Sequence, residues 1–465
     1  MLPTDRLHDL VAAKRAEHGV PGIAAGVVLG DNLAWFDGDG WADLETGLPP
    51  VERSLARVAS VTKTFTATAV LQLVDRGLLR LDDPLELHLP EFGQAVERGG
   101  RRAEVTIRRL LTHRSGLITE SPPTNWGEPR FPSMPEILAA MPQTAVVARP
   151  DVAGKYSNLA FALLGEVVAR HAGRGYVDYV QAEIFDPLKL HDLTFEPDAD
   201  ARALMMTGYS PAEHEDRPSL APNASLNGLT SAGQLHANVR DLARWVAFQT
   251  RGTGRTLDGH EILSAATLAE SQRPQYVELD FSAGQCLAWR MTRVGDLLFH
   301  NHGGSVHGFN SSVGFHLPTR VGIIVLANLW PTTVAAELAL AMFEAVVGSA
   351  AVGSSAVEAV GARTWPGSAP PEAAPHAIRP LLGRYRAEPG IVADLDWRAD
   401  ALRFLSPPGA FAVHTPSALE PLAGRDRSFR FVSGRAAGEE ITIEEAAGSG
   451  DLTFEVGGFV YRQSG

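Results

Sequence analysis

Two kinds of hydrophobic spacing alternate along the chain, and together they predict an order of secondary-structure elements. Residues 22–43 hold two strand-like runs around a Gly-Asp-Asn turn. Helical spacing comes before this pair of strands and returns several times after it. The predicted helices are an N-terminal one with Leu7, Leu10, Val11 and Ala12 on one face, and others at 60–79, 104–117 (closed by Gly116), 158–171 and 238–250.

The segment from 286 to 348 returns to strand-like spacing. It contains the runs CLAWRMTRV, DLLFHNHG, SSVGFHL and VGIIVLANL, joined by short turns, and an apolar helix follows at 332–348. Strands that follow one another directly favour an antiparallel sheet over alternating βαβ units. The pattern therefore predicts an α+β fold, in which both ends of the segment before 350 contribute to one sheet flanked by helices, with an all-helical lobe between them.

The composition changes at about 350–376, which is rich in Ala, Gly, Ser and Pro and is typical of a linker. It separates a predicted first domain, 1–349, from a second one, 377–465. The second contains the short strand candidates AFAVHT, SFRFV, EITIEE, LTFEV and FVYRQ, which predict a small all-β barrel or sandwich. Within the first domain, the Pro-rich residues 119–150 predict a long irregular loop, which either closes over a site as a lid or packs on the surface.

Charge and composition limit the classes of function and partner that we expect. The 465 residues carry a net charge of −13, which argues against a nucleic-acid partner because phosphate binding needs a basic face. Cys286 is the single cysteine, so no intrachain disulfide forms, and its setting predicts a small packed side chain. The N-terminus has no apolar segment typical of a signal peptide, and no stretch is as long as a membrane span. We therefore expect a soluble, cytoplasmic protein with no membrane partner.

Ser60 and Lys63 are the first candidate catalytic pair. The chain has only four lysines, and one of them follows Ser60 by three residues at the predicted start of a helix. Residues three apart on a helix share a face, so Lys63 can reach the Ser60 hydroxyl. Lysine can lose its proton in a protein interior whereas arginine effectively cannot, which suits a serine that needs a base. Taken alone, this spacing is equally consistent with a serine that caps a helix.

Two further motifs strengthen the catalytic interpretation. Tyr156 and Asn158 lie two residues apart at the start of an apolar helix, where alternate side chains can point the same way. A phenol near an ammonium group can take a proton and return it, and an amide can bind a substrate or Lys63. The third motif is the run His302-Gly303-Gly304-Ser305, whose glycines would let a substrate approach the backbone. The Ser60 and Ser305 N–H groups could form an oxyanion hole.

The SVTK, YSN and HGG motifs, in this order and spacing, resemble the three-motif set of class C β-lactamase-like serine hydrolases. The resemblance covers about residues 5–350, and the segment beyond the linker resembles the lipocalin-like β domain of some members. It implies a β-lactamase/transpeptidase-like fold with no cofactor and no metal. It also implies that Ser60 forms the acyl-enzyme and that Lys63 supports proton transfer. Tyr156 would be the general base that later protonates the leaving group, although Lys63 is the alternative first base, and Asn158 would orient Lys63 or the substrate.

His302 departs from the β-lactamase pattern, which has a lysine at this place. A neutral imidazole offers no permanent charge to a penicillin carboxylate. We therefore expect an esterase or a D-amino-acid peptidase or amidase acting on a small ester, amide or D-amino-acid peptide. A β-lactamase or a penicillin-binding DD-carboxypeptidase is the alternative, and an acyltransferase or a non-catalytic binding or sensor module is the second alternative.

Several other histidines invite different interpretations. His300, His302, His307 and His316 are close in sequence, but their spacing matches no familiar metal site, and we expect no zinc there. His113, in the sequence THRSG, is expected to be a histidine of a helix end or of the core and not a catalyst.

Overall fold

The structure is a computed structural model that describes residues 2–128, 130–211, 217–348, 374–388, 390–406, 416–446 and 450–464. The chain forms two compact units: unit 1 comprises Met1–Asp83 and Phe161–Ser354, and unit 2 comprises Pro84–Ala160 and Ser355–Gly465. Most of the predicted linker and the predicted strand AFAVHT lie outside the described residues. The domain boundaries drawn from the sequence therefore stay a prediction.

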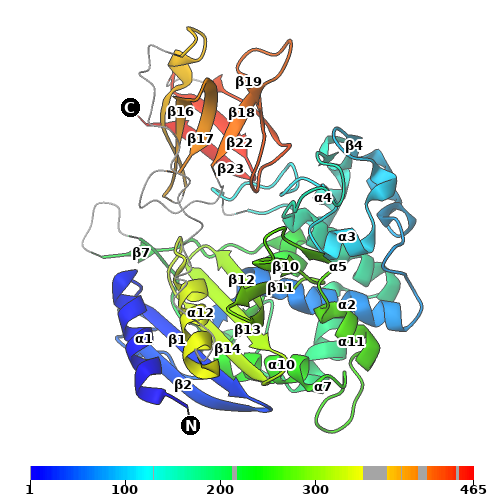
Figure 1. Ribbon diagram of the computed structural model, residues 1–465, viewed down its shortest axis with the longest axis vertical. Helices are drawn as coiled ribbons and strands as arrows, with labels where there is room; N and C mark the ends of the chain where they lie inside the picture. The colour runs from blue at the N-terminus through cyan, green and yellow to red at the C-terminus, as the bar shows by residue number, and fades with distance from the viewer. Residues whose placement is uncertain are drawn as a thin grey trace. The chain divides into compact units, whose positions relative to one another are not determined.

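Unit 1 is built around an antiparallel sheet of eight strands in the order β2-β1-β14-β13-β12-β11-β10-β9. Strand β1 pairs with both β2 and β14, so strands from the two ends of unit 1 lie side by side, as predicted (Figure 1). The bounds are β1 (Gly22–Leu29), β2 (Asn32–Gly40), β9 (Tyr276–Val277), β10 (Ala283–Gln285), β11 (Arg290–Val294), β12 (Leu297–Val306), β13 (Phe309–His316) and β14 (Val321–Ala327).

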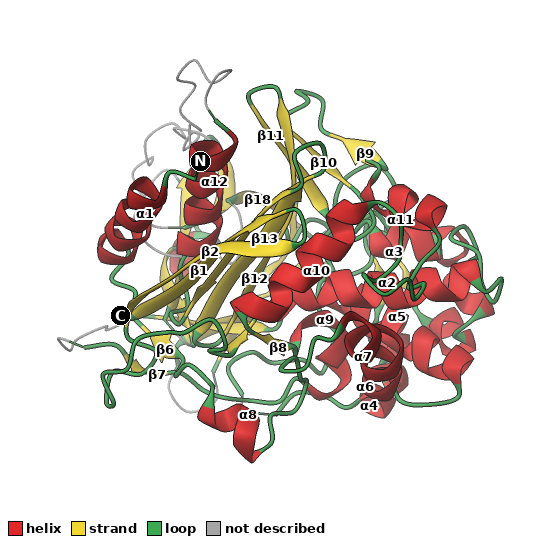
Figure 2. Cartoon of the chain, turned by 90° about the horizontal axis from the view of Figure 1, so that it is seen from below, coloured by secondary structure: helices red, strands yellow, loops and turns green. Residues whose placement is uncertain are grey.

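Helices cover both faces of this sheet. Helices α1 (Thr4–Glu17) and α12 (Val334–Val347) pack on one face and α10 (Val239–Arg251) on the other (Figure 2). Leu7 and Val11 are buried against the sheet as predicted, but Ala12 is exposed because the buried stripe of α1 is narrower than the sequence pattern indicated. On the opposite face, Gly26 and Gly322 let α10 approach the strands, since a side chain at either position would collide with a valine of α10.

The helical part of unit 1 surrounds α2 (Thr62–Asp75), in which residues 62–73 are all buried. The sequence predicted one helix over 60–79. The structure instead places Ser60 on a short 3-10 turn (Ala59–Val61) before α2, and the helix ends four residues earlier than predicted. Among the described residues, the other α-helices of this unit are most of α5 (Asn158–Ala172), α6 (Tyr176–Val180), α7 (Asp186–Leu188), α8 (Ala199–Ala203), α9 (Thr230–Gly233) and α11 (Ala265–Gln272). Two short sheets pair β3 (Ala56–Arg57) with β8 (His236–Ala237) and β6 (Tyr209–Ser210) with β7 (Ser219–Leu220).

The first segment of unit 2 contains short helices joined by turns. The helix predicted over 104–117 is only α3 (Ile107–Leu111), because the chain turns at His113 and Gly116, which both have positive φ. The predicted loop 119–150 contains helix α4 (Met134–Ala139) and strand β5 (Ala145–Val146), which pairs with β4 (Val96–Glu97). Helix α5 (Asn158–Ala172) begins at the end of this segment.

The second segment of unit 2 is a nearly closed antiparallel β-barrel, which confirms the predicted all-β domain. Its described residues form nine strands in the order β20-β19-β18-β17-β16-β15-β23-β22-β21, and β20 lies beside β22. Aromatic rings fill its interior, including the buried Tyr385, Phe404, Phe454 and Tyr461. The strands are β15 (Gly383–Ala387), β16 (Ile391–Arg398), β17 (Ala401–Leu405), β18 (Ser417–Pro421), β19 (Ser428–Phe431), β20 (Glu440–Thr442), β21 (Glu444–Glu445), β22 (Leu452–Val456) and β23 (Phe459–Gln463).

The described helices are short for a bilayer. The longest, α5, has 15 residues, whereas crossing the hydrocarbon core takes about 20. In the part of the chain that the structure describes, no helix is both long and apolar enough to span a membrane.

Candidate active site

Ser60 and Lys63 meet as the sequence predicted. Lys63 Nζ donates a hydrogen bond to Ser60 Oγ over 3.1 Å, from the first turn of α2 back to the 3-10 turn. Ala59, which precedes the serine, has a φ of 47°, and Thr62 Oγ1 donates to the Ala59 carbonyl over 2.6 Å. The tight turn therefore presents the Ser60 hydroxyl to the lysine at the start of a buried helix.

The Lys63 ammonium group is enclosed by the protein. Its side chain is fully buried, and Nζ donates a second hydrogen bond to the Ala232 carbonyl of α9 over 2.7 Å. The Phe161 ring lies 5.5 Å from Nζ, close enough for a cation–π contact. These contacts hold the nitrogen at one place beside Ser60, and a lysine so enclosed is suited to proton transfer.

Strand β12 approaches the Ser60 turn at Gly304. A Cβ at this position would collide with the Val58 carbonyl and with Ser311 Oγ, which itself donates to Val58 O over 2.9 Å. Only a glycine lets the strand lie this close to the segment before Ser60. Ser305 follows on the same strand, where its hydroxyl accepts a hydrogen bond from Asn310 Nδ2 over 2.9 Å.

His302 is buried on β12 and is uncharged near neutral pH. Burial, together with the Lys63 charge, lowers the pKa of the imidazole to about 4. Its Nδ1 donates to the Gly303 carbonyl over 2.7 Å, which leaves Nε2 as a hydrogen-bond acceptor. The expectation that this histidine offers no permanent charge agrees with its surroundings.

Tyr156 and Asn158 belong to unit 2, whereas Ser60, Lys63 and His302 belong to unit 1. The Tyr156 ring stacks on His113 at 4.1 Å between centroids, and the Ser157 N–H donates to His113 Nδ1 over 3.2 Å. His113 is buried beyond the end of α3, as expected, but it also supports the tyrosine. His113 has a φ of 54°, a backbone conformation that hydrophobic spacing does not predict.

Asn158 is held by Glu120, a residue that the sequence analysis missed. Asn158 Nδ2 donates to Glu120 Oε1 over 2.5 Å, and both side chains are buried. The preceding Ser157 caps α5, because its hydroxyl accepts the Ala160 N–H over 3.0 Å while donating to the Ile118 carbonyl over 2.7 Å. The amide of Asn158 is thus fixed in orientation and is not used as the helix cap.

Two of the histidines that could suggest a metal have separate partners. His300 Nε2 donates to the Gln272 carbonyl over 2.9 Å, and His316 Nδ1 lies 2.8 Å from Thr319 Oγ1. Cys286 is buried, it donates to the same Gln272 carbonyl, and burial raises the pKa of its thiol to about 12. This cysteine is a packed side chain, as predicted, and is a poor thiolate ligand.

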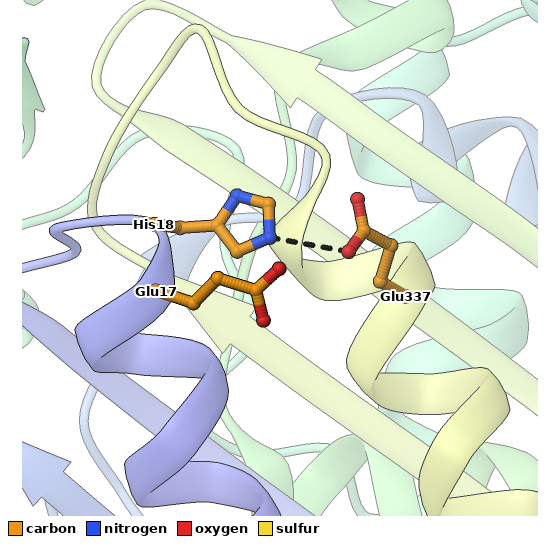
Figure 3. Close-up of side chains that lie close together, drawn as sticks. All are labelled: Glu17, His18 and Glu337. Carbon is orange, nitrogen blue, oxygen red and sulfur yellow. Dashed lines mark hydrogen bonds and ion pairs between the residues drawn. The ribbon is translucent and has the colours of Figure 1, made fainter. Parts of the chain in front are cut away.

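One group of possible metal ligands occurs among the described residues. Glu17, His18 and Glu337 bring their ligand atoms within 4.8 Å of one another between α1 and α12, and His18 Nε2 contacts Glu337 Oε2 at 3.2 Å (Figure 3). Lys14 occupies the same place, however, and its Nζ lies 2.9 Å from Glu17 and 3.0 Å from Glu337. With an ammonium group already on both carboxylates, the cluster is an ion-pair network that ties two helices together.

Comparisons with known proteins identify relatives. A family model described as Beta-lactamase matches residues 7–347. Penicillin-binding protein 4 of Amycolatopsis lactamdurans is 27% identical over 398 residues, which are 84% of this chain and 100% of that protein. The D-alanyl-D-alanine-carboxypeptidase/endopeptidase AmpH of Escherichia coli K12 is 30% identical over 233 residues, which are 49% of this chain and 57% of AmpH.

The likeness extends to solved structures. The octameric penicillin-binding protein homologue from Pyrococcus abyssi superposes with a TM-score of 0.64 at 21% identity, covering 99% of this chain and 100% of that one, which shows a shared fold. By contrast, the matched region is only 57% to 62% of the length of several sequence relatives, so the chain spans about three fifths of those proteins.

Proposed function

The chain belongs to the beta-lactamase family, and from this membership we propose that it is a serine hydrolase that cleaves a small ester or amide through an acyl-enzyme on Ser60. The observation that carries the proposal is the pair of hydrogen bonds from Lys63 Nζ to Ser60 Oγ and to the Ala232 carbonyl. They hold a buried lysine next to Ser60. A serine hydroxyl needs a nearby proton acceptor before it can act as a nucleophile.

In the proposed reaction the Ser60 oxygen attacks the substrate carbonyl and forms a tetrahedral intermediate. The proton of the Ser60 hydroxyl passes to Tyr156, or to Lys63 as the alternative first base. The base then gives this proton to the leaving group as the bond between the leaving group and the carbonyl carbon breaks. Water attacks the resulting ester on Ser60 and gives up a proton to the same base, which returns it to Ser60 Oγ as the bond from that oxygen to the acyl carbon breaks and the acid is released. Asn158, which Glu120 holds in place, orients Lys63 or the substrate.

Stabilisation of the intermediate is assigned to backbone groups. We assign the oxyanion hole to the N–H groups of Ser60 and Ser305, next to Gly303 and Gly304. The glycine requirement at Gly304 supports this role, because it is what lets β12 lie against the Val58 segment that leads to Ser60.

We base the proposed substrate class on His302. A neutral imidazole with Nε2 as an acceptor suits a neutral donor group better than a carboxylate, which favours an esterase or a D-amino-acid peptidase or amidase. The names of AmpH and of penicillin-binding protein 4 support a second candidate, a DD-carboxypeptidase or β-lactamase. An acyltransferase or a non-catalytic binding or sensor module is the second alternative. The cytoplasmic location stays a prediction.

Intact mass spectrometry within seconds of mixing tests the proposal. The reagents are p-nitrophenyl butyrate, D-alanine p-nitroanilide and a penicillin, each run with wild type and Ser60→Ala. A transient adduct with turnover of the ester or anilide, absent from the variant, supports the proposed hydrolase. A persistent penicilloyl adduct favours the second candidate. No adduct with any reagent would contradict the proposed activity.

A further inference from the structure

The C-terminal barrel contacts the motif that carries the proposed acid–base residue, and both belong to unit 2. The contact is made by the β19–β20 loop, residues 432–439, through Arg435 and Glu439. We infer that the barrel is part of the catalytic apparatus, with Arg435 as a positioning residue for Tyr156 and Glu439 as the anchor of the backbone before it. This inference rests on the proposed function, in which Tyr156 moves the proton.

Glu439 is the anchor because it accepts hydrogen bonds from Lys155, the residue before Tyr156, and from Thr119, whose carbonyl accepts the Asn158 N–H. Its Oε1 accepts from Lys155 Nζ over 2.5 Å, from Thr119 Oγ1 over 2.7 Å and from the Thr119 N–H over 3.1 Å. Burial opposes the charge of Glu439, but Lys155 and the Thr119 donors outweigh it and hold the pKa of the carboxyl below its usual value. Removing one partner of such a buried pair leaves the other charge uncompensated, so the contact is costly to break.

Lys155 extends the attachment to the loop backbone. This lysine is the residue before Tyr156, its side chain is 1% exposed, and Nζ also donates to the Arg435 carbonyl over 2.6 Å. The same ammonium group therefore binds the barrel at two points, and the chain on either side of it is fixed. The position of Tyr156 depends on this attachment.

Arg435 contacts Tyr156 directly and is linked to Asn158 through Glu120. Its guanidinium carbon lies 5.1 Å from the centroid of the Tyr156 ring, a cation–π distance. Its Nη2 lies 3.5 Å from Glu120 Oε1, the oxygen that accepts from Asn158. Within unit 2, His113 and Arg435 thus both contact the Tyr156 ring, and of these two residues Arg435 is the one that belongs to the barrel.

The chemistry offers a readout that separates positioning from general support of the fold. An amide nitrogen must receive a proton as its bond to the carbonyl carbon breaks, whereas p-nitrophenolate leaves without one. A displaced Tyr156 slows both substrates wherever it serves as the base, but it should slow the anilide more than the p-nitrophenyl ester, because only the anilide also needs it as a proton donor. A general loss of folded protein would lower both rates by the same factor.

The test compares Arg435→Gln, Arg435→Lys and the control Arg430→Met in the full chain. Arg430 lies on β19 of the same barrel and pairs with Glu440 at the surface. We expect Arg435→Gln to lower kcat for D-alanine p-nitroanilide by about tenfold or more, with little change in KM and a much smaller loss with p-nitrophenyl butyrate. Arg435→Lys should recover part of the loss, because it restores the cation, and Arg430→Met should match wild type.

Tyr156→Phe separates failure of this inference from failure of the proposed function. If Tyr156→Phe loses the anilide selectively while Arg435→Gln keeps the wild-type ratio of the two rates, the inference is wrong and the proposed function stands. If Tyr156→Phe behaves like wild type, this inference and the assignment of Tyr156 as the acid–base residue are both wrong, whereas the Ser60 acyl-enzyme is tested separately by its adduct. If Arg435→Gln has a lowered melting temperature, the ratio of the anilide rate to the ester rate is measured in Glu439→Gln and Arg435→Lys. A ratio equal to that of wild type in both variants overturns the inference.

Discussion

Lys63 Nζ lies 3.1 Å from Ser60 Oγ and donates a hydrogen bond to it, although the two residues sit on different kinds of helix. The serine is on a 3-10 turn and the lysine is in the first turn of α2, so the lysine side chain extends back over the junction to reach the serine. Because a second hydrogen bond ties the same nitrogen to Ala232, the pair is held without help from a substrate. Binding would therefore find the nucleophile and its lysine already in place.

The first prediction concerns the chemistry of Lys63. Lys63→Arg keeps the positive charge but not a group that can lose its proton, and the larger guanidinium has to fit a fully buried site. We expect kcat/KM for p-nitrophenyl butyrate to fall by about a hundredfold or more. Near-normal rates would reduce Lys63 to an electrostatic support.

Gly304 provides a structural prediction with a matched control in the neighbouring residue. Gly304→Ala would drive a methyl group into the Val58 carbonyl and Ser311 Oγ, and we expect a loss of about 1–3 kcal/mol in the free energy of unfolding, with a loss of turnover. At Gly303 the nearest atom to an added Cβ is the Ser311 carbonyl oxygen at 3.7 Å, so Gly303→Ala should fold normally. Urea denaturation measures both, and equal stabilities would contradict the close approach of β12.

Two buried histidines predict how stability depends on pH. Burial lowers the pKa of His302 to about 4 and that of His236 to about 3, with the charges of Lys63 and Arg57 acting in the same direction. Below about pH 6.5 these histidines bind protons in the unfolded chain but not in the folded chain. The free energy of unfolding therefore decreases as the pH is lowered. Each histidine should lower the free energy of unfolding at pH 4.5 by about 2–3 kcal/mol relative to its value at pH 7.5.

His236→Gln tests this dependence away from the motifs. The variant should show a smaller change in the free energy of unfolding between pH 7.5 and 4.5 than wild type, by about 2–3 kcal/mol. Urea titrations at the two pH values give the difference. An identical pH dependence in variant and wild type would mean that His236 titrates normally in the folded chain.

The elements that the sequence predicted well are those with long, regular patterns. The eight-residue strand β1 and the helices α1 and α10 follow from spacing alone. The helix predicted over 104–117 did not form at full length, because His113 adopts a left-handed backbone conformation that hydrophobic spacing does not reveal. Short helices in unit 2 are set by such turns.

The candidate site divides in the same way. Contacts between residues of one local motif could be predicted from the sequence, and Lys63 does donate a hydrogen bond to Ser60, as their spacing indicated. Glu120 and Arg435 were missed, since their contacts join positions far apart in the chain. Lys155 and Glu439 are 284 residues apart, and no local pattern around either one indicates the other.

The most direct test of the account is the mass of the intact protein seconds after mixing with p-nitrophenyl butyrate. We predict a transient increase equal to a butyryl group, mapped to Ser60 by peptide analysis, that decays as p-nitrophenol continues to be released. Ser60→Ala should show neither adduct nor turnover, while its thermal melt stays close to that of wild type because the substitution removes one hydroxyl group. A wild-type protein without adduct, or a Ser60→Ala variant that keeps its turnover, would contradict the assignment of Ser60 as the nucleophile.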